Sequence, residues 1–537
     1  MKDKAIQSPL DGIKGLKENW KTDIVSGFII FLIALPLCIG IAVASGAPPV
    51  SGIFAGIVGG IFVSLFSGSY VTINGPAAGL IVIVLHAIDN LGMGDPSIGF
   101  KYTLAAIVCA GILQVIMGIF RSGSIVALFP ASVIHGMLAS IGIIIFSKQF
   151  HTALGVKPES KEVFDLILEI PRSISHLNPE LALIGCVSLC ILIVLPMIKN
   201  DWIKRIPAPL LVVIVAVILS NLFDISHEHS VTLFNHSYSI GPKDLVALPN
   251  VLLNGMVFPD FSIIFSIKSI STIIAIALVA SLESLLTASA VDKLDPFKRR
   301  SNMNQELIAK GIGNTFLGFI GGIPIIAEVV RSSANITNGA RTRWSNFFHG
   351  LFLLLFILLV PGLIQKIPLA SLAAILMIVG YRLSSPGQFK EIYKVGNEQL
   401  VIFLSTIFFT LWVDLLVGIG MGILTKILVQ FIQGVSPSEM FVLKHDKKVE
   451  KNGTNVISIT GAATFSNYIL LRRAIANIPQ DKNIILDFSN SKFIDHTVME
   501  NLIELGIQKE NEANRIIIKN VKGQKRLSEE IGTAKVH

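Results

Sequence analysis

Apolar runs long enough to cross a bilayer recur along almost the whole of this sequence. The first is VSGFIIFLIALPLCIGIAVASG and the last is LLVGIGMGILTKILVQFI, each near or above the roughly 18 residues that span the hydrocarbon core. Of the 537 residues, 52% are hydrophobic and only 15% are charged. These features predict an all-α polytopic membrane protein whose core is built in lipid, and they argue against a soluble enzyme.

The positions of Lys and Arg indicate which loops face the cytoplasm. Basic residues gather in several short segments, among them 199–205, 293–300 and 341–343. If all of these are cytoplasmic, about 14 spans fit between them and both termini lie in the cytoplasm. Residues 1–23 are then a cytoplasmic segment without a cleavage site, and residues 24–433 form the membrane domain. The net charge of +8 follows from this topology, so the expected partner is the lipid bilayer of the cell (inner) membrane and not a nucleic acid.

The predicted spans fall into two halves, 24–223 and 268–433, with about seven in each. Two tandem halves with an odd number of spans must insert with opposite orientations, which makes an inverted repeat. The third element of the first half contains INGPAAG, residues 73–79, and the third element of the second half contains GGIPIIAEVVRSS, residues 321–333. The two halves are therefore interrupted by Gly and Pro at corresponding places.

These interruptions predict two half-helices, which begin at Pro76 and Pro324. Proline is suited to the first helical position, and the amides that follow it point back toward the break. Free amides at this depth are tolerated only where protein or a water-filled cavity satisfies them. Two helix N-termini that face one another create a positive potential, so the expected ligand is an anion. The alternative is a pair of kinked helices with no ligand.

Glu283 is an ionisable residue within a predicted span, and such a residue is a functional candidate by default. Ser284 and Thr287 lie with Glu283 on one helical face, so carboxylate and hydroxyl oxygens suited to Na⁺ or to a proton come together. The alternative role of Glu283 is a structural hydrogen bond to the neighbouring half-helix.

Arg331 is a second intramembrane candidate, two turns beyond Pro324 on the predicted half-helix. It would place a fixed positive charge near the anion. The alternatives are an ion pair with Glu328, three residues earlier, or an extended side chain that reaches the cytoplasmic face.

Several stretches together resemble the sulfate permease (SulP) family of anion transporters: INGPAAG, VASLESLLTASAVDKL, NQELIAKGIGN and RSSANITNGARTRWSNFFHG. The resemblance implies a 7+7 inverted repeat divided into core and gate domains, with an anion held between the third and tenth spans and moved by an elevator-like displacement. It also implies a homodimer. Carried over to this sequence, the anion site would use Arg331 and the backbone of Gly75, Ala77, Ala78, Ile325, Ile326 and Ala327.

The resemblance also bears on coupling and substrate. Sodium-coupled bicarbonate members carry an acidic residue and, four residues later, a Thr. Glu283 and Thr287 match this pattern, so Na⁺ is the expected coupling ion. Na⁺ is also the only metal expected, and no other cofactor is expected. Proton-coupled members carry a glutamate just after the first-span proline, whereas Leu37 follows Pro36 here. The motifs look most like a branch often associated with carbonic anhydrase, which favours bicarbonate over sulfate by analogy. Sulfate or dicarboxylate symport, anion exchange, and proton coupling remain open, as does a membrane anchor with a signalling domain.

The composition changes after Phe431. Strand patterns in NVISITG, NIILDFS and RIIIKNV alternate with helical patterns, which predicts a small cytoplasmic α/β domain over residues 437–521. This domain resembles the STAS domain appended to SulP transporters, where it would act in regulation or in dimerisation. In related proteins a phosphorylated serine follows the aspartate; here His496 follows Asp495, and Thr497 comes next. Residues 522–537 form a polar tail that is expected to be poorly ordered.

Overall fold

The structure is a computed structural model of the chain. It describes residues 8–124, 129–160, 162–200, 206–233, 236–249, 251–450, 453–478, 483–502, 516–519, 525–526 and 535–536. Most of the basic segment 199–205 and most of the predicted tail lie outside these residues. The chain forms two compact units, which are described separately: unit 1 is Met1–Gly123 with Ile141–Leu383, and unit 2 is Ser124–Ser140 with Ser384–His537.

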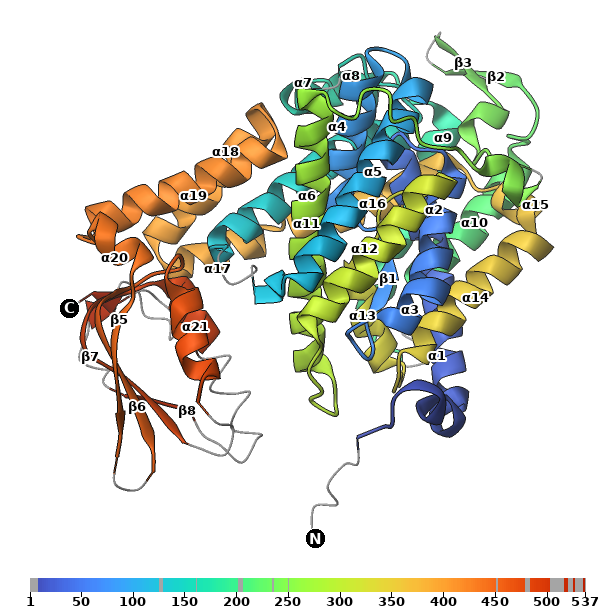
Figure 1. Cartoon of the computed structure of the whole chain (residues 1–537). Coiled ribbons are helices and arrows are strands. Elements are labelled where there is room, and N and C mark those ends of the chain that lie inside the picture. The colour runs from blue at the N-terminus through green and yellow to red at the C-terminus, as the bar shows by residue number, and fades with distance from the viewer. Residues whose placement is uncertain are drawn as a thin grey trace. The chain divides into compact units, whose positions relative to one another are not determined.

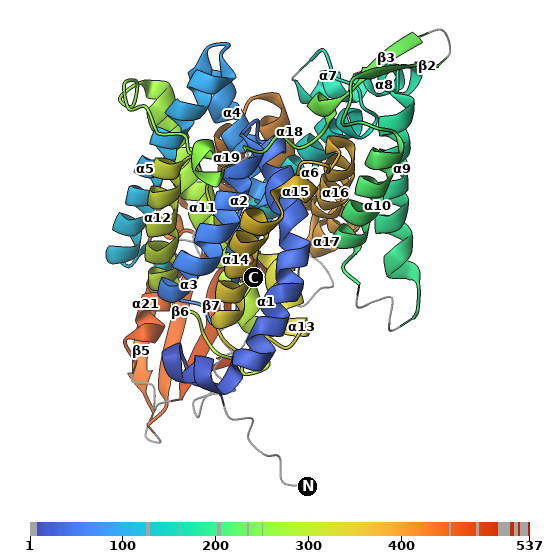
Figure 2. The ribbon, with the colours of Figure 1, turned by 90° about the vertical axis from the view of Figure 1, so that its right-hand side faces the viewer.

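Unit 1 consists mainly of apolar helices. Its uninterrupted helices and its one hairpin are α1 (Gly12–Ala44), α2 (Pro49–Ile57), α3 (Val63–Phe66), α5 (Pro96–Ile119), the second part of α6 (Ala131–Ala153), α7 (Val163–Leu168), α8 (Ile170–Ser175), α9 (Pro179–Val194), α10 (Ala208–Leu222), β2 (His229–Leu233), β3 (His236–Ile240), α11 (Ile267–Leu294), α12 (Met303–Ile320), α14 (Trp344–Leu359), α15 (Pro361–Ile364) and α16 (Leu369–Leu383). Helix α5 packs against both α11 and α12, and the three stand side by side in Figures 1 and 2. Helix α1 packs against α14.

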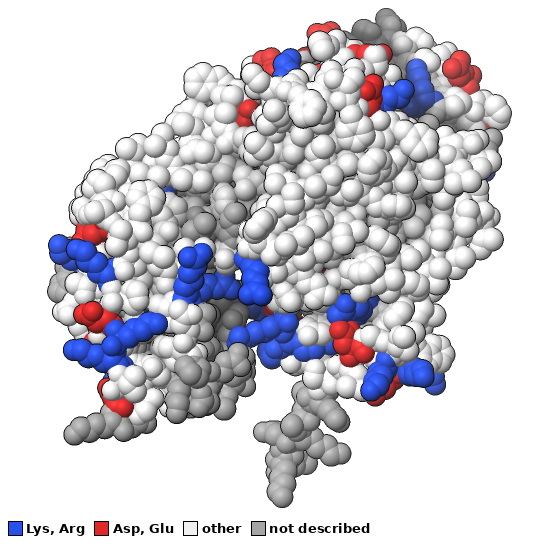
Figure 3. Space-filling model, viewed as in Figure 1, with Lys and Arg blue, Asp and Glu red and all other residues white. Residues whose placement is uncertain are grey.

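The helices have the composition of membrane spans. Within the described residues, eight helices are long and apolar enough to cross a membrane, and four more apolar helices have 10–17 residues. Large apolar side chains such as Phe265, Ile267 and Leu359 are exposed on the surface of unit 1, as expected where lipid replaces water. Figure 3 shows a wide band without charged atoms over these helices, with charged side chains at its two ends. The prediction of a helical polytopic membrane protein therefore holds, while the number of spans stays a prediction.

Two elements of unit 1 are interrupted, one in each half of the chain. The first consists of β1 (Ile73–Gly75), a 3₁₀ turn (Ala78–Leu80) and α4 (Ile81–Gly92). The second consists of β4 (Ile326–Glu328) and α13 (Val329–Thr337). β1 and β4 pair antiparallel, with Asn74 opposite Ala327 and Gly75 opposite Ile326.

The predicted starts of the half-helices at the two prolines are wrong. Pro76 separates β1 from the 3₁₀ turn, which begins at Ala78, and Pro324 precedes β4, so that α13 begins only at Val329. Arg331 is consequently in the first turn of its helix rather than two turns beyond the break. The physical reason is that pairing with a strand from the other half offers the backbone hydrogen-bond partners, which a helix start at this depth lacks.

Unit 2 joins apolar helices to a small α/β domain. Its elements are the first part of α6, α17 (Pro386–Val395), α18 (Asn397–Trp412), α19 (Leu415–Ile432), α20 (Pro437–Phe441), β5 (Lys444–Val449), β6 (Asn455–Ala463), α21 (Tyr468–Ala476), β7 (Ile484–Ile494), β8 (Ile516–Lys519), β9 (Lys525–Arg526) and β10 (Lys535–Val536). β7 pairs parallel with β6 and β8, and antiparallel with β10, while β5 pairs antiparallel with β6.

The α/β part of unit 2 follows the predicted strands, with two differences. The sequence analysis did not predict β5, because the strand is rich in Lys and its residues are almost all exposed. The tail beyond residue 521, predicted to be poorly ordered, supplies β9 and β10 to the sheet. These segments are thus strands because they pair with neighbouring strands, although their own composition does not favour a β-strand.

Asp495, at the end of β7, is held by the last apolar helix of the same unit. Its carboxylate accepts hydrogen bonds from Lys426 Nζ (2.6 Å) and Gln430 Nε2 (2.9 Å) on α19. Asp495 is completely buried and Thr497 is only 3% exposed. Thr497 is therefore shielded from a kinase in this conformation.

Candidate anion and cation site

Arg331 lies where the two interrupted elements cross. Its side chain is 1% exposed, which excludes the extension to the cytoplasmic face that the sequence left open. Nη2 donates a hydrogen bond to the carbonyl oxygen of Pro76, and Nη1 lies 3.6 Å from Cys38 Sγ on α1. Nε lies 3.5 Å from Glu328 Oε2, so the arginine both pairs with Glu328 and reaches the break in the first half.

Gly75 leaves the space that this guanidinium occupies. A Cβ added at Gly75 would lie 2.8 Å from Arg331 Nη1, closer than a side chain allows. A side chain at this position would therefore displace the guanidinium of the other half, whereas the backbone of Gly75 itself is not left-handed. Among the predicted site residues, the structure brings Gly75, Arg331 and Ile326 together.

The first half-helix begins without a side-chain cap. Ala77 precedes the 3₁₀ turn, and within the described chain no side chain accepts a hydrogen bond from its first amides. Ala77 is buried and Ala78 is half-buried. Uncapped amides at a helix N-terminus are the groups that bind anions, so this end fits the predicted role of Ala77 and Ala78.

A carboxylate lies directly against this helix start. Glu283, on α11, packs on Gly79 so closely that an added Cβ would overlap both carboxylate oxygens. Oε1 of Glu283 is buried and has no hydrogen-bond partner among the described residues. Thr287, one turn further along α11, is also buried. A cation or a proton would give this carboxylate the partner that it lacks.

The second half-helix is capped by its own carboxylate. Glu328 Oε2 accepts a hydrogen bond from the amide of Arg331 at 2.6 Å, which satisfies the positive end of α13. The positive character on this side therefore comes from the Arg331 guanidinium more than from the helix terminus, contrary to the symmetric pair of free N-termini that the sequence predicted.

Two of the predicted backbone ligands already have partners. The amide of Ile325 donates to Asn314 Oδ1 at 2.7 Å, and the amide of Ala327 donates to Ser284 Oγ at 3.4 Å. These residues lie beside the crossing, but their amides hold β4 in place. We call the interrupted elements the first half-site (β1, the 3₁₀ turn and α4) and the second half-site (β4 and α13). Ser284 is hydrogen-bonded to the second half-site, while Glu283 next to it faces the first.

Further polar groups at the crossing are buried without partners. Both side-chain amide atoms of Asn74 and Nε2 of His349 have no hydrogen-bond partner among the described residues, although both side chains are fully buried. Asn346 lies between these two residues: its Oδ1 accepts a hydrogen bond from the backbone amide of Asn74 (3.3 Å) and lies 3.3 Å from His349 Nδ1. Buried polar atoms of this kind indicate a place that takes up small polar ligands or water.

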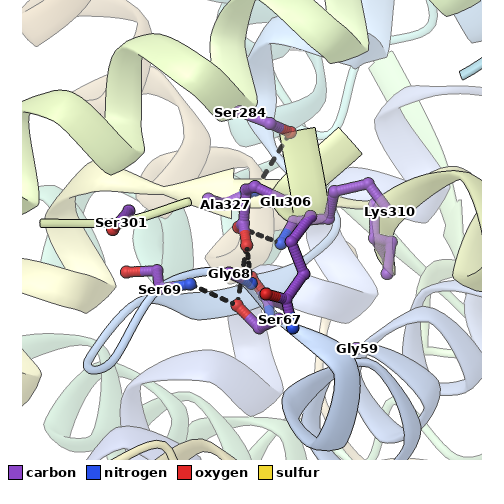
Figure 4. A network of polar contacts seen from close by, with 12 residues as sticks. Gly59, Ser67, Gly68, Ser69, Ser284, Ser301, Glu306, Lys310 and Ala327 are labelled. Atoms are coloured by element: carbon purple, nitrogen blue, oxygen red, sulfur yellow. Dashed lines mark hydrogen bonds and ion pairs between the residues drawn. The ribbon is translucent and has the colours of Figure 1, made fainter. Parts of the chain in front are cut away.

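Helix α12 contains a buried ion pair that was not predicted from the sequence. Glu306 and Lys310 are fully buried and bonded to one another, and Glu306 Oε2 also accepts hydrogen bonds from Ser67 Oγ (2.7 Å) and the Gly68 amide (2.9 Å) (Figure 4). The signal was available, because an acid and a base four residues apart within NQELIAKGIGN form a helical pair.

The candidate cation site differs from a transition-metal centre. Within the described ranges, no group of three or more His, Cys, Asp or Glu residues could hold a metal ion. One carboxylate with neighbouring hydroxyl oxygens is instead the chemistry of a weakly held alkali cation or of a proton.

A comparison with protein families gives the chain's membership. The model of the Sulfate permease family matches residues 20–406, which contain both interrupted elements and α11. The chain belongs to this family. Members of the Sulfate permease family are transporters and not enzymes, so the chain is an anion transporter.

Individual relatives agree with this membership. The putative sulfate transporter YvdB of Bacillus subtilis is 28% identical over 409 residues, which are 76% of this chain and 73% of that protein. The bicarbonate transporter BicA of Picosynechococcus is 28% identical over 407 residues, 75% of this chain and 69% of that protein. The transmembrane domain of a cyanobacterial BicA matches with a TM-score of 0.62 and 25% identity, over 75% of this chain and 97% of that chain. SLC26A9 shares the fold: the match has a TM-score of 0.65 and 16% identity, and it covers 94% of this chain and 84% of that chain.

Proposed function

We propose that this protein takes up bicarbonate together with Na⁺. The observation that carries the proposal is the Glu283 carboxylate packed on Gly79, at the uncapped start of the first half-helix. The anion would bind at this start, between the first half-site and Arg331. A negative charge is therefore built into the place where an anion is expected.

This arrangement couples the two ions electrostatically. Two unit charges about 4 Å apart repel one another by about 4 kcal/mol at an effective dielectric constant of about 20. Na⁺ bound to Glu283 and Thr287 removes this repulsion, so each ion raises the affinity for the other. A proton on Glu283 would act in the same way, which keeps proton coupling as the alternative mechanism.

The anion is proposed to lie among the residues carried over from the family. Gly75, Ala77 and Ala78 would surround it from the first half, with the amides that follow Ala77 as donors. Arg331 would supply the fixed positive charge. Ile325, Ile326 and Ala327 would lie next to the anion from the second half.

The choice of bicarbonate rests on the BicA relatives and on the acid at position 283. The alternative, sulfate or dicarboxylate symport or exchange, is favoured by the relatives named as sulfate transporters, YvdB and also YbaR of Bacillus subtilis, which is 26% identical over 522 residues. Both candidates use the same site and differ in the anion and in the response to sodium.

The finer architecture is part of the same proposal. The membrane domain would have 14 spans in a 7+7 inverted repeat, about 24–223 and 268–433, and its core would move against its gate like an elevator. Residues 437–521 would be a cytoplasmic STAS-like domain. We expect a homodimer in the cell (inner) membrane, with both termini cytoplasmic and with carbonic anhydrase as an associated partner.

Uptake into proteoliposomes tests the proposal. Radiolabelled bicarbonate and sulfate would be offered separately, with and without an inward sodium gradient, at fixed pH. The expected result is bicarbonate uptake that requires sodium. Sulfate uptake that is indifferent to sodium would overturn both the substrate and the coupling, while the membership of the family would stand.

A further inference from the structure

One face of α12 carries three fully buried polar side chains at a spacing of four residues: Glu306, Lys310 and Asn314. This spacing places the three side chains in one row along the helix. Burying two charges and an amide in a membrane domain is costly unless each has partners. The hydrogen-bond partners of these three side chains indicate their structural role.

Asn314 holds the chain that leads into β4. Its Oδ1 accepts a hydrogen bond from the Ile325 amide (2.7 Å), and its Nδ2 donates to the Ile325 carbonyl oxygen (3.2 Å). Nδ2 also donates to Gln114 Oε1 on α5 (2.8 Å), and Gln114 Nε2 donates to Ser281 Oγ on α11 (3.2 Å). Three helices thus fix both polar groups of one residue next to the crossing.

Glu306 holds the chain that leads into β1. Its carboxylate accepts hydrogen bonds from Ser67 Oγ and from the Gly68 amide, and its other oxygen is paired with Lys310 (Figure 4). The amide of Asn302, at the start of the same helix, donates to the Gly68 carbonyl oxygen at 2.9 Å. Both strands of the crossing are therefore attached to one helix.

We propose that α12 is the positioning element of the anion site, and that Asn314 is a positioning residue that sets the affinity for the anion. This inference rests on the proposed location of the anion at the β1–β4 crossing. Asn314 does not touch the anion; it holds Ile325, and through Ile325 it sets the place of β4 and of Arg331 relative to the first half-site. A displacement of about 1 Å at such a site costs about 100-fold in function.

The test compares saturable uptake by Asn314→Leu, Gln114→Leu and the double variant with wild type. Leu has a similar size to Asn and Gln but cannot form the hydrogen bonds that join Asn314 to Ile325 and to Gln114. The matched control is Thr315→Val, because the Thr315 hydroxyl donates to the carbonyl oxygen of Gly311 in its own helix and, within the described part of the chain, to no residue of the crossing. The anion used is whichever of bicarbonate and sulfate the wild type accumulates, so an error in the proposed substrate leaves this test intact.

The expected result is that KM rises about 10- to 100-fold in Asn314→Leu, while the maximal rate per folded protein changes less than about threefold. Gln114→Leu should raise KM by a smaller factor, and the double variant should match Asn314→Leu, because Gln114 acts through Asn314. Thr315→Val should keep the wild-type KM. Folding is checked by the thermal unfolding of each variant in detergent.

Two results would overturn the proposal. The first is an unchanged KM in Asn314→Leu, or in Gln114→Leu if Asn314→Leu does not fold. The second is a fully additive double variant, which would show that Gln114 does not act through Asn314. Sodium-independent uptake by the wild type would contradict the proposed function alone.

Discussion

Glu283 and Arg331 are buried charges of opposite sign placed at the two sides of one crossing. Glu283 lies against the start of the first half-helix, and Arg331 reaches from the second half to the carbonyl oxygen of Pro76. Burial excludes the extended conformation that was the alternative for Arg331, and among the described residues Oε1 of Glu283 does not form the structural hydrogen bond that was the alternative for Glu283. A carboxylate oxygen without a hydrogen-bond partner in the described part of the chain, next to the proposed anion site, favours ion coupling, whereas the ion pair with Glu328 offsets part of the Arg331 charge.

Glu283→Gln should remove the cation dependence of uptake. The amide is isosteric but carries no charge, so it neither repels the anion nor attracts a cation. The ratio of uptake rates with and without sodium should fall to about 1. Glu283→Asp is the matched control, because it retains the carboxylate and should keep a sodium response. An unchanged sodium response in Glu283→Gln would exclude this residue from coupling.

Ala78→Asp should abolish uptake by placing a negative charge at the uncapped helix start. We expect a loss of at least about tenfold relative to Ala78→Asn, which adds a side chain of nearly the same size without charge. Uptake is measured on correctly inserted protein, as judged by its elution from a sizing column in detergent. Equal activity of the two variants would contradict an anion site at this turn.

At the scale of elements, glycine determines how closely the helices can approach β1. A π-helical segment, Val58–Phe62, follows α2 and packs against β1 and α14. A Cβ added at Gly59 would lie 2.7 Å from the carbonyl oxygen of Asn74, and one at Gly60 would lie 2.6 Å from the amide nitrogen of Gly350. Small residues at such contacts let backbones meet, which is the usual means of packing helices in membranes.

Gly60→Ala should destabilise the membrane domain by about 1–3 kcal/mol, because the backbone of Gly350 cannot yield in the way that a side chain can. Thermal unfolding in detergent measures the effect. Gly362→Ala is the control, since nothing lies within 4 Å of the added Cβ and the residue has no left-handed backbone. Similar unfolding temperatures for both variants would show that the contact at Gly60 is not tight.

At the scale of the whole molecule, a membrane helix and the C-terminal sheet are joined by a buried charge pair within unit 2. Lys426 on α19 and Asp495 after β7 are 2% and 0% exposed, and the carboxylate also accepts hydrogen bonds from Gln430 Nε2 and from the backbone amides of Phe465 (3.2 Å) and Thr497 (3.4 Å). Asp495 is thus a structural anchor, which favours a fixed junction over a phosphorylation switch at this position.

Lys426→Met should destabilise the junction by about 3–5 kcal/mol, because it leaves the buried Asp495 carboxylate without its cation. Lys426→Met combined with Asp495→Asn should be less damaging than Lys426→Met alone, since no charge then stays buried. Hydrogen exchange of β6 and β7 in the full-length protein reports the effect. Wild-type protection in the single variant would contradict a junction that depends on this pair.

The class of the protein follows from its sequence alone, and the sequence also predicts where an anion site would lie. Long apolar runs predict membrane helices, and Gly-Pro interruptions at matching places mark the two half-sites, because composition and periodicity are local properties of a chain. The same local reasoning singled out Glu283 and Arg331, since a charge is conspicuous within an apolar run.

The way the crossing is built depends on contacts between segments that lie far apart in the sequence. β1 and β4 pair across the two halves, and this pairing moved the start of α13 from Pro324 to Val329. Asn314 and Glu306 gained their roles from partners on other segments, and β5 became a strand by pairing with β6. A buried polar group must find a partner, and the partner's place in the sequence is set by packing rather than by any local pattern.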